Sequence, residues 1–407
     1  MGQDYTMTIS LPAGALSADQ PVVSIAATAQ RNAGLDALRA AMVLLVVFHH
    51  TAITYGAAGS WYYREVMPDG SPGSKWLTLM CAVDQAYFMG LLFLLAGYFL
   101  PGSLARRGAL GLVKERLARL GIPILVFGLV IGPATIALGL TAKGVPFTST
   151  LLALWGVGTF AVGPLWFAVA LLIFTSGFLA WRGLSPRPGS KADAPRPRAF
   201  PSNATLAIAA LATGAAAFAL RLAWPVGTAP VLDLQLGYFA SYVVLFTAGC
   251  IGGPSQWLSH VPARQRRLWM IVAAIAIAVA GANVLAPSTS GAANTGTQLA
   301  TPAGGWNVPS ANYALWEPLV AWGVILGLVH LFGQGFVALG PTWSALARRS
   351  YAIYVIHPPV VVGIALAWRD VLAPHLVKFT VTGTLAALAC FWIAGLLLRV
   401  PGLKRVL

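Results

Sequence analysis

Long apolar runs alternate with short polar stretches along almost the whole chain. A helix needs about 20 apolar residues to cross a hydrocarbon core of roughly 30 Å, and ten stretches of that kind are present. The pattern therefore predicts an all-α, polytopic integral membrane protein with about ten transmembrane helices. The segment 142–162 is expected to be either a re-entrant or an interfacial piece. The expected spans are 35–55, 77–100, 122–141, 163–181, 204–223, 235–252, 268–286, 313–333, 350–369 and 379–398.

The basic residues predict how these spans are oriented. If the N-terminus is cytoplasmic, 20 of the 26 Lys and Arg residues fall in inner segments and six in outer ones. An excess of Lys and Arg marks the cytoplasmic side of a membrane protein. The distribution therefore predicts that both termini are cytoplasmic.

Composition agrees with a membrane protein and argues against other classes. The chain is 58% hydrophobic and only 9% charged, whereas ordinary soluble domains are about 45 to 50% apolar. The net charge of +15 suits inner loops that face anionic membrane lipid. No single basic patch carries interleaved aromatics, so nucleic acid is not an expected partner. The three cysteines are isolated within apolar spans, which indicates neither a disulfide framework nor a metal site.

The chain is expected to form one transmembrane domain with flexible additions. Residues 1–30 lack the basic and apolar regions of a signal peptide and are predicted to be a flexible tail, and the domain itself is predicted to cover 31–407. Within it, the Pro-rich basic segment 182–203 is predicted to be a disordered cytoplasmic loop.

The first span carries ionisable residues that are costly in lipid. Arg or Asp at the centre of a helix costs roughly 2.5 to 3.5 kcal/mol, yet this span contains Asp36, Arg39, His49 and His50. At 1.5 Å and 100° per residue, Arg39 and His50 share one helix face and lie about 16 Å apart along the axis. Asp36, three residues before Arg39, is placed to pair with it. The pair could act only as an interfacial anchor, and His50 could act only as a bridge between helices.

Two acids lie at a depth similar to that of His50. Asp84 and Glu317 are expected in the outer halves of the second and eighth spans. Ionisable groups within a membrane face cavities and mark functional sites, and imidazole serves as a base near neutral pH. The three residues therefore form a candidate site, either for catalysis or for the proton relay of a proton-coupled transporter.

Arginines gather at the predicted cytoplasmic side. Arg116 and Arg119 stand one helical turn apart before the third span, and Arg349 precedes the ninth, with His357 about two turns further on. Paired guanidinium groups bind phosphates well, although ordinary positive-inside flanking would give the same pattern.

Several motifs together resemble those of the membrane acyltransferase 3 family. "LDALRAAMVLLVVFHH" resembles its R-x10-H signature, in Arg39 and His50, and "KERLARLGIPIL" is similar to its RxxR stretch, in Arg116 and Arg119. "FMGLLFLLAGYFL", "GPLWF" and "SYAIYVIHPPVVV" resemble other motifs of the family, in the family's order over residues 31–399. "ALWEPLVAWGVILGL" is similar to the branch that contains glucan biosynthesis protein C.

The resemblance implies O-acyl transfer from cytoplasmic acyl-CoA to a carbohydrate or similar hydroxyl acceptor, in the inner membrane of a bacterium. By analogy His50 is the essential histidine, whereas His49 lacks the ten-residue spacing. If Asp84 or Glu317 lies close enough in the fold, its carboxylate is expected to orient the ring, as a carboxylate does at other acyl-transfer sites. Acyl-CoA is then a co-substrate and no permanently bound cofactor or metal is expected. The residues expected on the acyl-CoA side are Arg39, Arg116, Arg119, Arg349 and His357. A purely structural membrane protein is a further alternative, but it would not require these ionisable groups.

Overall fold

The computed structural model of the chain describes residues 21–184, 198–285, 304–333 and 340–407. The described residues contain no β-strand, only an isolated bridge between Tyr55 and Val66. The prediction of an all-α protein is therefore confirmed. The helices are α1 (Pro21–Thr54), α2 (Pro72–Arg116), α3 (Ile122–Val126), α4 (Gly132–Leu140), α5 (Phe147–Gly156), α6 (Trp166–Leu184), α7 (Asn203–Ala223), α8 (Phe239–Gly252), α9 (Ala263–Leu285), α10 (Val308–Gly333), α11 (Pro341–Ala367), α12 (His375–Leu397) and α13 (Leu403–Val406).

The described residues of the ten predicted spans are helical apart from a few at the span ends. By length and composition, eight helical segments of the described chain are long and apolar enough to cross a membrane. One of them, Pro72–Lys143, contains two predicted spans, and the span predicted at 235–252 corresponds to a shorter apolar helical segment, Leu236–Gly252. The segment 142–162, predicted to be re-entrant or interfacial, contains the short apolar helix α5, which buries none of its residues.

The long segment Pro72–Lys143 is divided by local backbone features. Gly108 has φ 68° and ψ 172°, a conformation open to glycine because it has no Cβ, and it interrupts the helical backbone between the second and third spans. Further on, π-helical turns at Leu117–Gly121 and Phe127–Ile131 precede Pro123 and Pro133. Proline cannot donate to the preceding turn and its ring crowds that turn, so wider π turns accommodate it.

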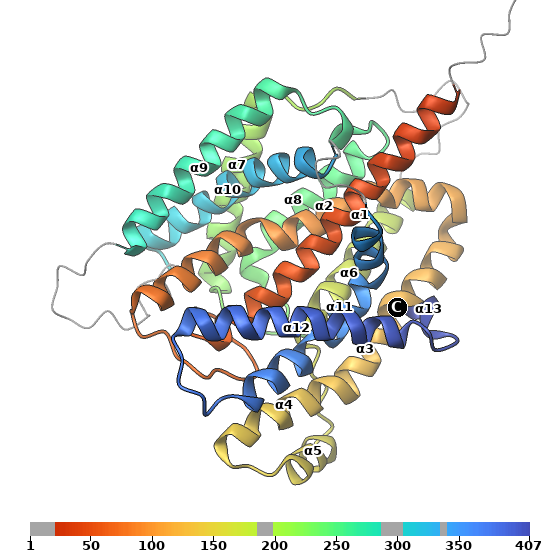
Figure 1. Cartoon of the computed structure of the whole chain (residues 1–407). Helices are drawn as coiled ribbons and strands as arrows, with labels where there is room; N and C mark the ends of the chain where they lie inside the picture. The colour runs from red at the N-terminus through yellow and green to blue at the C-terminus, as the bar shows by residue number, and fades with distance from the viewer. Residues whose placement is uncertain (1–20, 185–197, 286–303, 334–339) are drawn as a thin grey trace, which may run out of the picture.

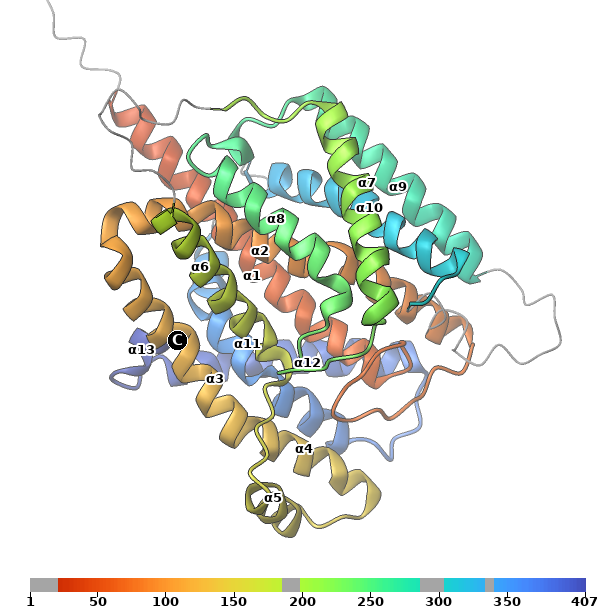
Figure 2. The ribbon, with the colours of Figure 1, turned by 180° about the vertical axis from the view of Figure 1, so that it is seen from behind.

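The two ends of the bundle are defined here by helix α1. The inner end is where α1 begins, and the outer end is where α1 ends at Thr54 and the loop 55–71 follows. Both α1 and α11 run from the inner to the outer end, and α12 returns (Figure 1). The chain also ends at the inner end, as the view from behind shows (Figure 2). This inner end is the one that the distribution of basic residues predicts to be cytoplasmic.

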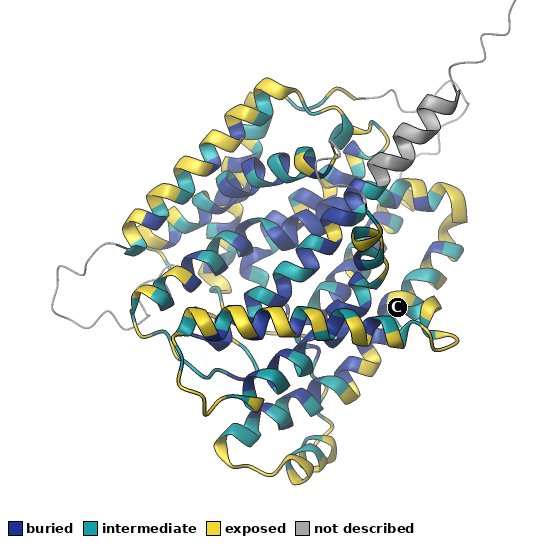
Figure 3. Ribbon diagram, viewed as in Figure 1, coloured by how far each residue is buried: buried dark blue, intermediate teal, exposed yellow. Residues whose placement is uncertain are grey.

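The core lies among α1, α2, α10 and α11. These helices are mostly buried in Figure 3, whereas α9 and α12 expose one long face. Helices α2 and α8 approach each other closely at Gly97 and Gly249, where an added Cβ would collide with the carbonyl of Phe246 or Leu94. Small residues allow such close backbone contact between helices in a membrane.

Two predicted boundaries fall near residues that are not described. Helix α1 begins at Pro21, ten residues before the predicted start of the domain at 31, and residues 1–20 lie outside the described residues. In the predicted loop 182–203, α6 ends at Leu184 and α7 begins at Asn203. Residues 185–197 of that loop also lie outside the described part of the chain.

Candidate active site

A cavity of about 400 Å³ lies in the outer half of the bundle. Its wall contains two histidines and four tyrosines, and no Asp, Glu, Lys or Arg is among its described lining residues. Helices α1, α2, α6, α8, α10 and α11 contribute to it together with the loops that follow α1 and precede α6 and α8. The polar lining side chains are His49, His50, Ser60, Thr78, Gln85, Gln235, Tyr238, Tyr242, Tyr313 and Tyr354.

His50 lies on the wall of this cavity within a group of stacked rings. Its imidazole stacks on Trp61 with ring centroids 3.8 Å apart and planes 13° apart. The ring of His357 lies 5.3 Å from it at 16°. The Nδ1 atom of His50 is buried and has no hydrogen-bond partner among the described residues. His50 is thus held by flat ring contacts while one ring nitrogen is left unpaired.

His357 lies beside His50, and not with the arginines of the inner end, where its sequence position predicts it. Helices α1 and α11 run side by side in the same direction, which brings this residue of α11 level with His50. The side chain is fully buried and its Nδ1 lies 2.7 Å from the carbonyl oxygen of Tyr354. A carbonyl only accepts, so Nδ1 carries the proton and Nε2 is the free acceptor. That Nε2 is buried without a partner among the described residues.

Asp84 lies next to His49 and not next to His50. The Oδ2 of Asp84 is 3.7 Å from the Nδ1 of His49, and both residues are buried. The reason is helical geometry, because consecutive residues on a helix point about 100° apart. The ring of His49 meets that of His50 edge-on, with centroids 5.5 Å apart, so Asp84 can reach His50 only through His49.

Glu317 pairs with Arg221, one of the six basic residues that the predicted topology places in outer segments. Arg221 is fully buried and its guanidinium donates to the Glu317 carboxylate. Its Nε also donates to the carbonyl of Gly237 at 3.1 Å. The guanidinium lies over the rings of Tyr238 and Tyr313, 5.2 and 5.0 Å from their centroids, and both tyrosines line the cavity. The ion pair therefore lies behind the cavity wall.

Burial of the arginine was not apparent from its flanking position in the sequence. Arg221 is in the last turn of α7, where basic residues normally reach water or lipid headgroups. A signal was present in the apolar neighbours of "LRLAW" and in the opposite charge of Glu317 in another span. Sequence alone does not show that these two residues meet.

The arginines of the inner end are more exposed. Arg39 pairs with Asp36 at 3.0 Å and both side chains are about half exposed, which confirms the predicted pair. Arg119 lies 3.9 Å from Glu115, and Arg349 lies over the ring of Phe391, 4.2 Å from its centroid. Arg116 is partly buried, and its Nε has no partner among the described residues.

The loop 55–71 adds uncharged aromatic groups at the outer end. Burial raises the pKa of Tyr62 well above its usual value, and the nearby Asp233 raises it further. Its phenol is therefore neutral at physiological pH and is not an available base. Among the described residues, no group of three or more His, Cys, Asp or Glu side chains is arranged to hold a metal ion.

Comparison with known proteins gives the chain a family context. A family model described as an acyltransferase domain, that of acyltransferase 3, matches residues 32–399. Glucans biosynthesis protein C of Salmonella heidelberg (strain SL476) is 30% identical over 200 residues, which are 47% of this chain and 49% of that protein. The protein of the same name from Salmonella paratyphi B is 31% identical over 160 residues, 38% of this chain and 40% of the relative. The chain thus spans about half the length, or less, of these relatives. No solved structure matches it.

Proposed function

The chain belongs to the acyltransferase 3 family, and on that premise we propose that it is a membrane-bound O-acyltransferase. It moves an acyl group from cytoplasmic acyl-CoA to a hydroxyl of a carbohydrate or similar envelope acceptor. The observation that carries the proposal is the position of His50, on the wall of an uncharged outer cavity with an unpaired ring nitrogen.

The proposed reaction uses His50 as a general base. A hydroxyl is a poor nucleophile at neutral pH, and a positioned imidazole contributes about 10² to 10⁴-fold to the rate. The imidazole takes the hydroxyl proton while the oxygen attacks the thioester carbonyl carbon. The C–S bond then breaks, and the departing CoA thiolate receives that proton. An acyl-histidine intermediate is the alternative, in which His50 is the nucleophile.

The acyl-CoA side is proposed to be the inner end. Arg116 has an unpaired Nε, and Arg119 and Arg39 are partly exposed there. Guanidinium groups bind the phosphates of such a donor with charge-assisted hydrogen bonds. Arg39 and His50 are separated by about 16 Å along one face of α1, so the same helix reaches from the donor side to the outer cavity.

The acceptor is proposed to be a neutral hydroxyl compound, with a glucan as the leading example. Charged lining groups are absent from the described wall, whereas phenol, hydroxyl and amide groups are abundant. Such groups exchange hydrogen bonds with sugar hydroxyls, and aromatic faces contact the apolar faces of sugar rings. The name of the relatives, glucans biosynthesis protein C, agrees with this choice. Their bacterial origin also favours a bacterial inner membrane as the location.

Acyl transfer by the purified protein tests this proposal. The protein is incubated with radiolabelled acyl-CoA and a glucan acceptor, and label in the glucan is counted for the parent, His50→Ala and His49→Ala. We expect His50→Ala to lose transfer while retaining acyl-CoA binding, and His49→Ala to keep substantial activity. Equal activity of His50→Ala and the parent would remove the catalytic role. Proton-coupled solute uptake by reconstituted protein without any acyl transfer would favour the transporter instead.

A further inference from the structure

An outer loop covers His50 and is attached to the bundle at both ends. The loop comprises residues 55–66, and its first and last residues, Tyr55 and Val66, form the isolated bridge. The backbone N–H groups of Glu65 and Val66 also donate to the carbonyl of Thr54, at 2.9 and 3.1 Å. Closed ends and a compact path are features of an Ω-loop. Between these ends the loop presents Trp61, the ring that stacks on His50.

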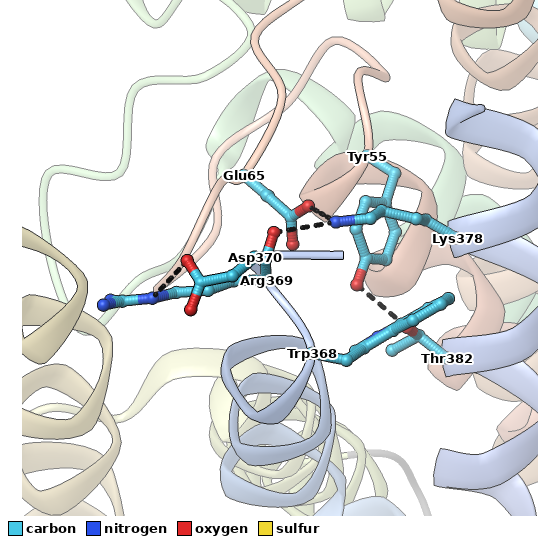
Figure 4. Close-up of polar contacts among 7 residues, drawn as sticks. All are labelled: Tyr55, Glu65, Trp368, Arg369, Asp370, Lys378 and Thr382. Atoms are coloured by element: carbon cyan, nitrogen blue, oxygen red, sulfur yellow. Dashed lines mark hydrogen bonds and ion pairs between the residues drawn. The ribbon is translucent and has the colours of Figure 1, made fainter. Parts of the chain in front are cut away.

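Helix α12 holds the two ends of this loop by residues four positions apart. Lys378 donates to the Glu65 carboxylate and, at 3.0 Å, to the carbonyl of Arg369. One turn later, Thr382 Oγ1 lies 2.8 Å from the hydroxyl of Tyr55. Residues at i and i+4 share a helix face, so one face of α12 holds both ends, as Figure 4 shows.

Trp368 connects the two attachment points. Its Nε1 donates to Thr382 Oγ1 at 3.0 Å, and Lys378 Nζ lies 5.4 Å from its ring centroid. Tyr55 and Thr382 are fully buried, and the side chains of Lys378 and Glu65 are 5% and 13% exposed. Removing one partner of such a buried ion pair strongly destabilises the fold, because the other charge remains buried and unpaired.

From this geometry we propose that Lys378 and Glu65 are positioning residues for His50. Their ion pair holds the loop 55–66 closed, which keeps the Trp61 ring flat against the imidazole. The same loop supplies Ala58, Gly59 and Ser60 to the cavity wall, so it also forms the outer boundary of the acceptor cavity. The catalytic part of this inference rests on the proposed function; the closure of the loop does not.

Chemical modification of His50 tests loop closure without any need for activity. Diethyl pyrocarbonate carbethoxylates neutral imidazole, and mass spectrometry of peptides measures the rate at His50. We expect Lys378→Met and Glu65→Gln to raise this rate by about tenfold, because loss of a buried ionic partner releases the loop. Lys378→Arg keeps the charge and should stay close to the parent rate. Asp370→Asn is a matched control, because Asp370 is 94% exposed and its ion pair is with Arg369, 3.5 Å away, and not with the loop.

Transfer assays then separate a positioning role from a structural one. In folded Lys378→Met, we expect kcat to fall by about tenfold while the KM for acyl-CoA is unchanged. If Lys378→Met does not fold, Thr382→Val provides the same test at the other end of the loop with a side chain of equal shape. A rate of His50 modification that equals the parent rate in Glu65→Gln and in either of these variants would overturn the proposal. Activity retained by His50→Ala would instead overturn the proposed function and leave loop closure intact.

Discussion

The two ends of the apolar segment Ala33–Thr54 of helix α1 place ionisable groups in opposite environments. At the inner end, Asp36 and Arg39 form a half-exposed pair. At the outer end, His49 is 8% exposed and His50 is half-buried against the ring of Trp61. An exposed ion pair contributes about 0 to 1 kcal/mol to stability, whereas an unsatisfied buried polar group costs about 1 to 3 kcal/mol. One R-x10-H spacing therefore joins two sites that should respond differently to substitution.

The difference extends to the neighbouring helices. Polar groups of the outer half are buried and held in pairs, as in Arg221 with Glu317 and Lys378 with Glu65. Those of the inner end have partly exposed side chains. We therefore expect outer substitutions to change folding or turnover, and inner substitutions to change mainly the affinity for the acyl donor.

The largest expected effect is on stability, at Glu317. Glu317→Ala leaves Arg221 buried without its carboxylate partner, and the expected cost is about 3 to 5 kcal/mol. Thermal unfolding in detergent measures this loss. Replacing both residues by methionine should recover much of the stability, because a buried ion pair exchanged for apolar side chains is often neutral. If Glu317→Ala unfolds at the same temperature as the parent, the Arg221–Glu317 pair is not needed for stability. The predicted catalytic role of Glu317 then gains support.

The second prediction concerns His357. His357→Phe keeps a flat ring next to His50 but removes both ring nitrogens, so the hydrogen bond to Tyr354 is lost as well. Loss of this hydrogen bond should let the ring beside His50 shift, and a loss of about 1.4 kcal/mol in transition-state stabilisation corresponds to a fall in kcat of about tenfold. The affinity for acyl-CoA, measured by calorimetry, should not change. Weaker acyl-CoA binding by this variant would instead support the predicted role of His357 in binding acyl-CoA.

The third prediction concerns donor binding at the inner end. Arg116→Ala and Arg119→Ala should each weaken acyl-CoA binding by about tenfold or more, because a hydrogen bond to a charged group contributes about 1.5 to 3 kcal/mol. Lys143→Ala is the control, since Lys143 is exposed near α5 beyond the outer end of α4. If the two folded variants bind acyl-CoA with unchanged affinity, Arg116 and Arg119 serve only as topological anchors.

The smallest expected effect is on stability at Arg39. Arg39→Ala and Asp36→Ala should each change the free energy of unfolding by no more than about 1 kcal/mol, because the pair is half exposed. Only Arg39→Ala should also weaken acyl-CoA binding. If both variants bind acyl-CoA as tightly as the parent, the Asp36–Arg39 pair only anchors the helix.

The spans themselves were predictable from sequence because their signal is local. Twenty apolar residues in a row satisfy their own backbone hydrogen bonds as a helix, so each predicted span needed no partner to be recognised. The pairing of Asp36 with Arg39 was predictable for the same reason, since it depends only on a separation of three residues in one helix.

Partners between helices were not predictable in this way. Asp84 and Glu317 were expected near His50 because their depths matched, but depth does not specify the direction in which a side chain points. In the folded chain Asp84 reaches His49, and Glu317 reaches Arg221. His357 was assigned to the donor side by its distance from Arg349 along the sequence, yet eight residues carry it about 12 Å along α11, to the level of His50.

The sequence by itself therefore determined the helical class, the spans, the charge asymmetry and the position of Arg39 and His50 on one helix face. Each of these depends on composition or on separations within one helix, which fixed helical geometry translates directly into space. Only the tertiary structure decided that Trp61 covers His50, that His357 lies beside it and that Lys378 holds the covering loop. These contacts join residues from 11 to more than 300 positions apart in the sequence. Which residues meet depends on how the helices and loops pack, and a local sequence pattern does not specify that packing.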